Sequence, residues 1–315
     1  MSTPRATLVL VLLLTSCTRP PQREELPTAA QVPVAIVVER AISGEILGQR
    51  LRRPFGLAVD SRGAGYLVDG GNNRILKFAA DLTFTEDIGG FGAAEGLFNR
   101  PTYVTIDNEL NLLVADEGNR RICRYNSRLE FVETIPFSDA DDPLKFGLPS
   151  GIGVSDYGEL WVADRERHRL AVFNNVGSFE RFMGEFGAAG GQVRSPAKIA
   201  RSRHGNFLVC DAGNGRIVVY DEYGNFERDF GRDYLAEPVA AIADAARIWV
   251  LDKSSSKILL FDARGRPVFE AGPMLPGTDN AMKETSDLVF FSDDQLLISD
   301  TGNDRLLVCR VISGE

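Results

Sequence analysis

Short apolar segments recur along this chain with a nearly constant period. Each segment ends in Asp, and five residues after that Asp stands an Arg or a Lys. The six copies are Asp69 and Arg74, Asp116 and Arg121, Asp164 and Arg169, Asp211 and Arg216, Asp252 and Lys257, and Asp300 and Arg305. Successive copies begin 41 to 48 residues apart, which indicates one supersecondary unit repeated along the chain. Units of this size cannot bury a core singly and must pack on one another.

The strands expected within one unit can be read from residues 100–147. Apolar or alternating segments cover residues 103–106, 111–115, 121–125 and 131–135, and turn residues separate them. This pattern predicts a four-stranded antiparallel meander. The second segment is almost wholly apolar in every unit, which is typical of a strand buried on both faces. The sequence therefore predicts an all-β fold, a six-bladed β-propeller with four-stranded antiparallel blades.

Closure of the ring requires a strand from the other end of the chain. The last unit, from Leu288 onward, contains three predicted strands and lacks a fourth. We expect the missing outer strand to come from the N-terminal side, since closure removes the free sheet edges. Residues 34–38 and residues 42–47 both have suitable composition, and the sequence leaves open which of them pairs. The propeller is predicted to occupy residues 32–315.

The repeated phrase resembles the NHL repeat. It is best preserved in Asp69-Gly-Gly-Asn-Asn-Arg74 and in Asp211-Ala-Gly-Asn-Gly-Arg216, and units end in phrases such as Gly-Gly-Phe91-Gly. The resemblance extends over about residues 53–315 and implies a six-bladed propeller. Residues 164–169 and 252–257 depart from the pattern because they lack the Gly-Asn step.

The six Asp and Arg or Lys pairs are interpreted as structural. Each Asp is expected to accept hydrogen bonds from backbone amides of its own tight turn, while the cation holds it in place. The Gly and Asn that follow suit positive φ in such a turn. The alternative is a ring of carboxylates around one cation. No cofactor is predicted, although the sequence leaves a Ca²⁺ site made only of carboxylates open.

The N-terminus has the pattern of an export signal. Arg5 precedes a short apolar run that ends in Leu14-Thr-Ser-Cys17. The run is too short to span a bilayer, and its end resembles the bacterial lipobox. Residues 1–16 are therefore predicted to be a lipoprotein signal peptide, with Cys17 as the lipidation site and residues 17–31 as a Pro-rich tether. The resemblance implies an anchor in the bilayer, at the outer membrane of a diderm bacterium, facing the periplasm or the cell surface.

The net charge indicates which partners are not expected, and the spacing of the cysteines indicates their role. The net charge is −9 for the whole chain, and it becomes −10 without residues 1–16, which carry only Arg5. An acidic surface repels phosphate backbones, so nucleic acid is not an expected partner. The other cysteines, Cys123, Cys210 and Cys309, are predicted to be small buried hydrophobic residues because they show no metal or disulfide spacing.

Candidate contact residues come from positions that the repeat does not dictate. Two residues after the Pro that opens each unit, or the Thr in the last unit, stand Gly56, Tyr103, Gly151, Lys198, Ala240 and Asp287. We expect this ring at the channel mouth, beside the long connections between units. Tyr103, Lys198 and Asp287 are the candidate ligand contacts there.

The sequence favours a non-catalytic binding or scaffold module for protein, peptide or glycan partners at the cell envelope. No catalytic motif is recognised, and no catalytic or metal-binding residue is assigned. The two histidines, His168 and His204, fall in turns expected at opposite ends of a blade. The alternative, implied by related propellers, is a metal-dependent hydrolase or lyase that works in the central channel.

Overall fold

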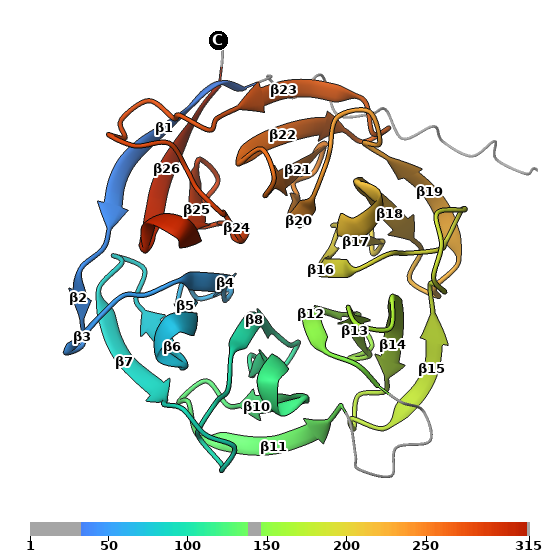
Figure 1. The fold of residues 1–315 in the computed structure, drawn as a ribbon, viewed down its shortest axis with the longest axis horizontal. Helices are drawn as coiled ribbons and strands as arrows, with labels where there is room; N and C mark the ends of the chain where they lie inside the picture. The colour runs from blue at the N-terminus through green and yellow to red at the C-terminus, as the bar shows by residue number, and fades with distance from the viewer. Residues whose placement is uncertain (1–32, 138–145, 314–315) are drawn as a thin grey trace, which may run out of the picture. The chain divides into compact units, whose positions relative to one another are not determined.

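The computed structural model describes residues 33–137 and 146–313, and these residues form six four-stranded antiparallel sheets arranged as a ring (Figure 1). This confirms the predicted six-bladed propeller. The expectations for the signal peptide, Cys17 and the tether lie outside the described residues. Within the described part of the chain, no helix has the length and apolar character that crossing a bilayer requires.

The first three blades each use four consecutive strands, running from the central channel to the rim. Blade 1 contains β4 (Pro54–Val59), β5 (Gly65–Asp69), β6 (Arg74–Phe78) and β7 (Phe84–Gly89). Blade 2 contains β8 (Pro101–Ile106), β9 (Leu112–Asp116), β10 (Arg121–Tyr125) and β11 (Phe131–Pro136). Blade 3 contains β12 (Pro149–Val154), β13 (Leu160–Asp164), β14 (Arg169–Phe173) and β15 (Phe179–Met183).

The last three blades follow the same order, except that the outer strand of blade 6 comes from the start of the chain. Blade 4 contains β16 (Pro196–Arg201), β17 (Phe207–Asp211), β18 (Arg216–Tyr220) and β19 (Phe226–Phe230). Blade 5 contains β20 (Pro238–Ala243), β21 (Arg247–Asp252), β22 (Lys257–Asp262) and β23 (Pro267–Ala271). Blade 6 contains β24 (Asp287–Phe290), β25 (Gln295–Asp300), β26 (Arg305–Ser313) and β1 (Pro33–Ile42).

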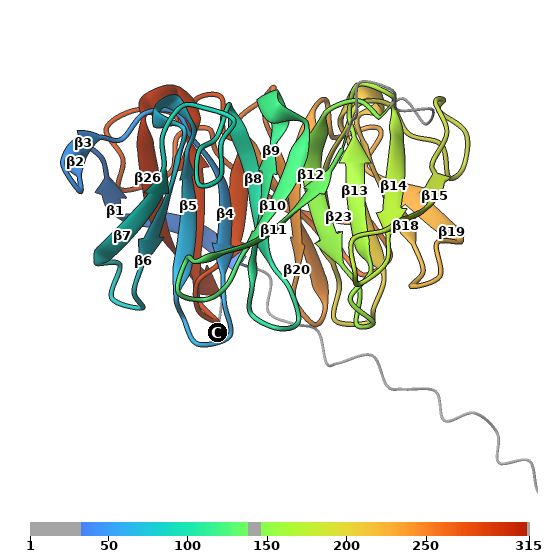
Figure 2. The ribbon, with the colours of Figure 1, turned by 90° about the horizontal axis from the view of Figure 1, so that it is seen from below.

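The two ends of the ring differ in the connections they carry (Figure 2). The connections between blades and the turns between second and third strands lie at one end, here called the loop end. Short 3-10 turns occupy the second kind of connection in four blades: η1 (Gly70–Asn72), η2 (Glu117–Asn119), η3 (Ala212–Asn214) and η4 (Thr301–Asn303). The turns between first and second strands lie at the opposite end, here called the turn end.

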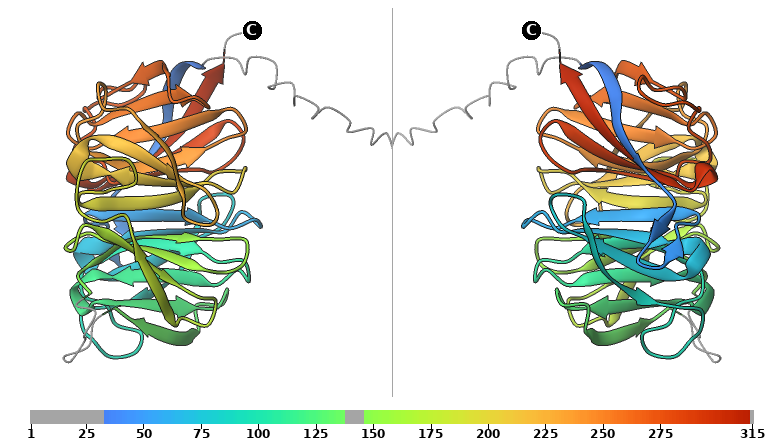
Figure 3. Two further views of the ribbon diagram at one scale, coloured as in Figure 1. Left: turned by 90° about the vertical axis from the view of Figure 1, so that its right-hand side faces the viewer. Right: turned by 90° about the vertical axis from the view of Figure 1, so that its left-hand side faces the viewer.

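The ring is closed by β1, which pairs antiparallel with β26 from Ile42 opposite Leu306 to Pro33 opposite Ser313. Figure 3 shows this N-terminal strand running beside the last strand of the chain. Of the two stretches left open by the sequence, the first, residues 34–38, therefore supplies the outer strand. The second stretch leads into a small hairpin of β2 (Glu45–Ile46) and β3 (Gln49–Arg50).

The core lies between neighbouring blades. Every residue of the second strands β5, β9, β13 and β17 is buried, as their continuous apolar pattern predicts. Contacts across blades include the stacked rings of Trp161 in blade 3 and Phe207 in blade 4, whose centroids lie 3.9 Å apart. Cys123, Cys210 and Cys309 are free and buried, which confirms their interpretation as small hydrophobic residues.

Five of the six repeated pairs form ion pairs. The distances from Arg Nε to Asp Oδ2 are 2.8 Å for Arg74 and Asp69, 2.8 Å for Arg121 and Asp116, 3.2 Å for Arg169 and Asp164, 2.7 Å for Arg216 and Asp211, and 2.6 Å for Arg305 and Asp300. The sixth expectation was wrong, because Lys257 Nζ pairs with Glu270 at 2.5 Å. Asp252 instead accepts hydrogen bonds from the amides of Ala236, Glu237 and Ser255. A Lys lacks the guanidinium fork that bonds Asp and loop carbonyls together.

The repeated Asp residues mainly hold the connection that enters their own blade. Asp69 accepts from the amide of Arg52, and Asp211 accepts from the amide of Arg194, in each case 17 residues earlier in the chain. The expectation that each Asp bonds amides of its own turn therefore needs correction. It holds for Asp164 and Asp252, which accept from the amides of Arg167 and Ser255. In the four units with an Asn three residues after the Asp, the Asn side chain makes that bond instead.

The Gly of the repeated phrase serves close approach and not positive φ. The amide of Gly213 donates to Arg194 O at 2.8 Å, and a Cβ added at Gly213 would lie 2.7 Å from that oxygen. Positive φ occurs two residues later, as at Asn73, Arg120 and Asp304.

The hydrogen bonds and ion pairs of the six repeated Asp residues show that each carboxylate belongs to its own blade. This contradicts the alternative of six acids gathered around one cation.

Candidate functional site

The six ring positions at the start of the first strands alternate between small and large residues. Gly56, Gly151 and Ala240 belong to blades 1, 3 and 5, and Tyr103, Lys198 and Asp287 belong to blades 2, 4 and 6; all six are buried. The small residues let neighbouring first strands approach closely, since a Cβ at Gly56 would lie 2.8 Å from Tyr103 Cα. The large side chains therefore extend into the space that remains on the axis.

Lys198 and Asp287 form an ion pair inside the channel. The Nζ atom of Lys198 lies 2.6 Å from Asp287 Oδ1 and also donates to Leu288 O at 3.2 Å. The amides of Leu57 and Leu288 each donate to the Asp287 carboxylate at 2.8 Å. Both side chains are almost completely buried, at 5% and 1% exposed. Burial raises the pKa of Asp287, and the strongest influence that lowers it is Lys198. The charge of this carboxylate therefore depends on its partner.

Tyr103 completes this layer. The Lys198 ammonium lies 5.5 Å from the centroid of the Tyr103 ring. Burial, with a smaller contribution from the charge of Asp287, raises the pKa of Tyr103 well above its usual value. The phenol therefore keeps its proton at neutral pH and is a hydrogen-bond donor. No described residue forms a hydrogen bond with its hydroxyl group, although the side chain is only 7% exposed.

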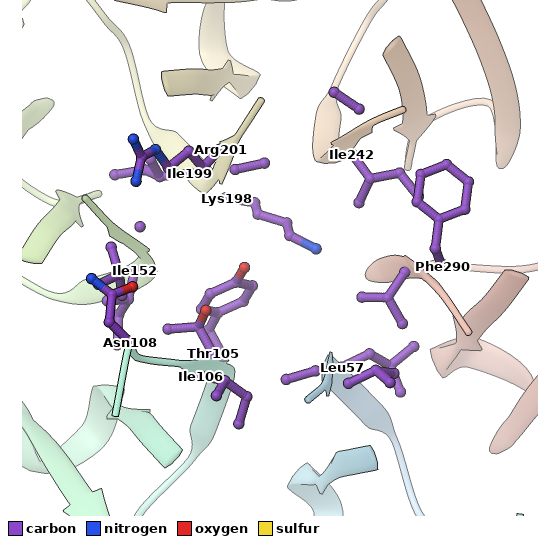
Figure 4. Close-up of a pocket in the computed structure, with 18 of the residues that line it drawn as sticks. Leu57, Thr105, Ile106, Asn108, Ile152, Lys198, Ile199, Arg201, Ile242 and Phe290 are labelled. Carbon is purple, nitrogen blue, oxygen red and sulfur yellow. The ribbon is translucent and has the colours of Figure 1, made fainter. Parts of the chain in front are cut away.

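A cavity of about 470 Å³ extends from this layer toward the turn end (Figure 4). All six first strands line it, through the ring residues Tyr103 and Lys198 and through residues that follow the ring positions along each strand. Its inner end is formed by Tyr103 and Lys198, and its outer part by the turn residues Asn108 and Asp156. None of the described lining residues belongs to the loop end. The cavity therefore opens at the turn end, and the buried layer separates it from the loop end.

The two sides of the cavity differ in chemistry. Thr105, Asn108 and Arg201 provide hydrogen-bonding groups on the side of blades 2 to 4, together with the inner-end pair Tyr103 and Lys198. The opposite side, formed by blades 5, 6 and 1, is apolar, and it consists of Ile242, Ala243, Val289, Phe290, Leu57, Ala58 and Val59. Figure 4 shows Ile242, Phe290 and Leu57 facing the labelled polar side chains, which stand among the apolar side chains of Ile106, Ile152 and Ile199.

The mouth of the cavity is polar and continues into a second hollow. Arg201 forms an ion pair with Asp156 there, and Asn108 donates to Ser155 O at 2.8 Å. An adjoining hollow of about 240 Å³ shares Asn108 and Asp156 with the cavity and is also lined by Tyr157. The Tyr157 side chain is 69% exposed. A ligand longer than the cavity could follow this hollow over blades 2 and 3.

The sequence prediction identified the residues of the inner layer but placed them incorrectly. Tyr103, Lys198 and Asp287 share one level of the channel, as expected from the repeat. They were expected at the channel mouth beside the loop end, whereas all three are buried, and Tyr103 and Lys198 form the inner end of a cavity that opens at the opposite end. Thr105, Arg201 and Phe290 were missed. The register of the first strands could have identified them, because they stand two or three residues after the ring positions on the same strands.

Metal-binding side chains are not gathered anywhere in residues 33–137 and 146–313, where no group of three His, Cys, Asp or Glu residues could hold an ion. His168 lies at the loop end, where its Nδ1 accepts from the amide of Ser195 at 3.0 Å. His204 lies at the turn end, beside a small hollow of blades 4 and 5. The two histidines are thus separated as expected.

Comparisons with known proteins agree with the fold. The NHL repeat family model matches residues 146–173. A 131-residue segment, 41% of the chain, is 28% identical to Protein brain tumor of Drosophila melanogaster, of which it covers 13%. This chain therefore spans only a small part of that curated relative. The chain is a six-bladed propeller that contains an NHL repeat.

Solved structures of similar fold include two bacterial proteins. The virginiamycin B lyase from Staphylococcus aureus is 14% identical with a TM-score of 0.65, and the match covers 88% of this chain and 100% of the lyase. A gluconolactonase from Xanthomonas campestris is 13% identical with a TM-score of 0.65, and the match covers 90% of this chain and 98% of that protein. At these identities the similarity establishes the fold alone.

Proposed function

We propose that this propeller is a non-catalytic binding module that takes part of a peptide, glycan or protein partner into its channel. The main support is the cavity with a closed inner end, which is built by all six first strands. Its volume lies within the range of about 300–1,000 Å³ that is usual for ligand pockets. Its few polar groups converge at the inner end and along one wall, as in sites that orient a bound molecule.

Photocrosslinking tests whether a partner enters the cavity. Thr105 in the cavity wall, or Ala93 in the exposed connection between blades 1 and 2, is replaced by p-benzoylphenylalanine in the full-length protein. Irradiation of cells that carry each variant should give an adduct at residue 105 and none at residue 93. Adducts formed only at residue 93 would place the partner at the loop end and contradict the proposal.

The proposal includes attachment to the cell envelope through a lipidated Cys17. Cys17→Ala should move the protein from the membrane fraction to the soluble fraction, since two or more acyl chains on Cys17 are the only anchor proposed. Cys123→Ala, which changes a buried thiol within the propeller, serves as the control and should stay with the membrane. Membrane association of Cys17→Ala after a carbonate wash would refute the anchor.

Catalysis in the channel is the second candidate. It is favoured by the pair of Lys198 and Asp287 next to Tyr103, because such a set can hold or transfer a proton. The lyase and the gluconolactonase of similar fold make a hydrolase or lyase reaction the class to test. Conversion of the bound molecule, detected as a change in its mass, would replace the non-catalytic proposal.

A further inference from the structure

We propose that the channel cavity binds the end of an uncharged saccharide, which enters from the turn end and places a hydroxyl or carbonyl oxygen against Tyr103 and Lys198. This inference rests on the proposed binding function and specifies its ligand. Three features of the cavity support it: free donors at the inner end, neutral charge at that end, and two walls of different polarity.

The inner end of the cavity carries hydrogen-bond donors that no described residue uses. An ammonium group carries three N–H donors. Two of those of Lys198 are used on Asp287 Oδ1 and Leu288 O, which leaves one. The Tyr103 hydroxyl is a second donor, and no described residue accepts from it. Both donors line the cavity, so the inner end favours a ligand that brings an oxygen acceptor.

The charge at the inner end favours an uncharged acceptor. Asp287 neutralises Lys198 at 2.6 Å, and the backbone amides of Leu57 and Leu288 already bind the carboxylate. A ligand carboxylate or phosphate placed there would add a buried charge without a counterion, close to Asp287. Burial of such a charge is strongly unfavourable. A hydroxyl, an acetal oxygen or an amide carbonyl accepts the same hydrogen bonds without that cost.

The walls match the two kinds of surface that a sugar ring presents. A pyranose has faces made of C–H groups and an edge of hydroxyl groups. Ile242, Val289 and Phe290 can pack against the C–H face, while Thr105 and Arg201 on the opposite wall can bond the hydroxyl edge. The adjoining hollow at Asn108, Asp156 and Tyr157 leaves room for further units of the chain outside the cavity.

Glycan-array binding and calorimetry of the purified full-length protein test this ligand class. The probes are neutral glycans, including glucose, N-acetylglucosamine and cellobiose, and matched charged ones, including glucuronic acid and glucosamine. We expect a neutral glycan to bind most tightly. Tyr103→Phe should weaken its binding about three- to tenfold, the usual effect of one lost hydrogen bond. The control Tyr125→Phe removes a hydroxyl that is buried between blades without a partner, away from the cavity, and should leave binding unchanged.

The outcomes separate this inference from the broader proposal. Tighter binding of glucuronic acid than of glucose, equal binding by Tyr103→Phe and the wild type, or no glycan binding would each overturn the saccharide assignment. If the photoadduct at residue 105 still forms and carries a peptide, the cavity remains the binding site and only the ligand class is wrong. If no adduct forms at residue 105 either, the proposed function fails as well.

Discussion

Deletion of residues 1–42 is expected to abolish the folded monomeric propeller, whereas deletion of residues 1–31 leaves it folded. The longer deletion removes β1, the outer strand of blade 6, and leaves the edge of β26 unpaired. It also removes the buried side chains of Ile36, Val38 and Ile42, each worth about 1.5–3 kcal/mol. This sum is a large part of the 5–15 kcal/mol that stabilises a typical domain.

Thermal unfolding followed by circular dichroism, together with size-exclusion chromatography, measures the effect. The deletion of residues 1–31 is the matched control, since it shortens the chain without touching a described strand. Loss of the cooperative transition and aggregation are expected for the longer deletion alone. Equal melting temperatures for the two proteins would contradict the role of β1 in closing the ring.

Lys198→Met is expected to lower the free energy of unfolding by about 3–5 kcal/mol, because it leaves Asp287 buried without its partner. The control, Lys257→Met, breaks the exposed pair with Glu270, whose side chains are 36% and 51% exposed, and should cost no more than about 1 kcal/mol. The double variant Lys198→Met with Asp287→Asn removes the unpaired charge and should recover most of the loss. Denaturant unfolding of the variants measures these differences. Equal losses of unfolding free energy for Lys198→Met and Lys257→Met would contradict the buried ion pair of Lys198 and Asp287.

The loss of unfolding free energy caused by Lys198→Met should also depend on pH. Burial already raises the pKa of Asp287, and removal of Lys198 removes the strongest influence that lowers it. A carboxyl group whose folded-state pKa is raised contributes most to stability near and below its unfolded pKa, about 3.9, and loses that contribution as the pH rises. The variant should therefore be closest to the wild type in acid and furthest from it at neutral pH. If the difference in unfolding free energy between the variant and the wild type did not change with pH, Asp287 would not take up a proton in the variant.

The repeat made the architecture predictable. A period of 41 to 48 residues, with one buried apolar strand in each unit, allows few folds other than a closed ring of sheets. The bonding of the repeat was less predictable, because the spacing of Asp252 and Lys257 is the same as in the other units. Only the structure shows that Lys257 extends to Glu270, and that the Asp residues hold the incoming connections of their blades.

The site could be predicted in part. The register of the units placed Tyr103, Lys198 and Asp287 at one level of the channel, since equivalent positions of a ring lie at equal depth. Whether Lys198 reaches Asp287 depends on how closely the first strands approach. Gly56 and Gly151 allow this close approach because they have no Cβ, and how near the strands come is seen only in the structure. The position of the cavity at the turn end also depends on which side chains fill the axis, and sequence spacing does not determine this.

The most direct test of the account is a crystal structure of the propeller grown with its tightest-binding neutral glycan. We expect density for a sugar ring between Phe290 and Thr105, with one oxygen within hydrogen-bonding distance of Tyr103 Oη and Lys198 Nζ. Density for the glycan over the connections of the loop end, with only water in the cavity, would contradict it.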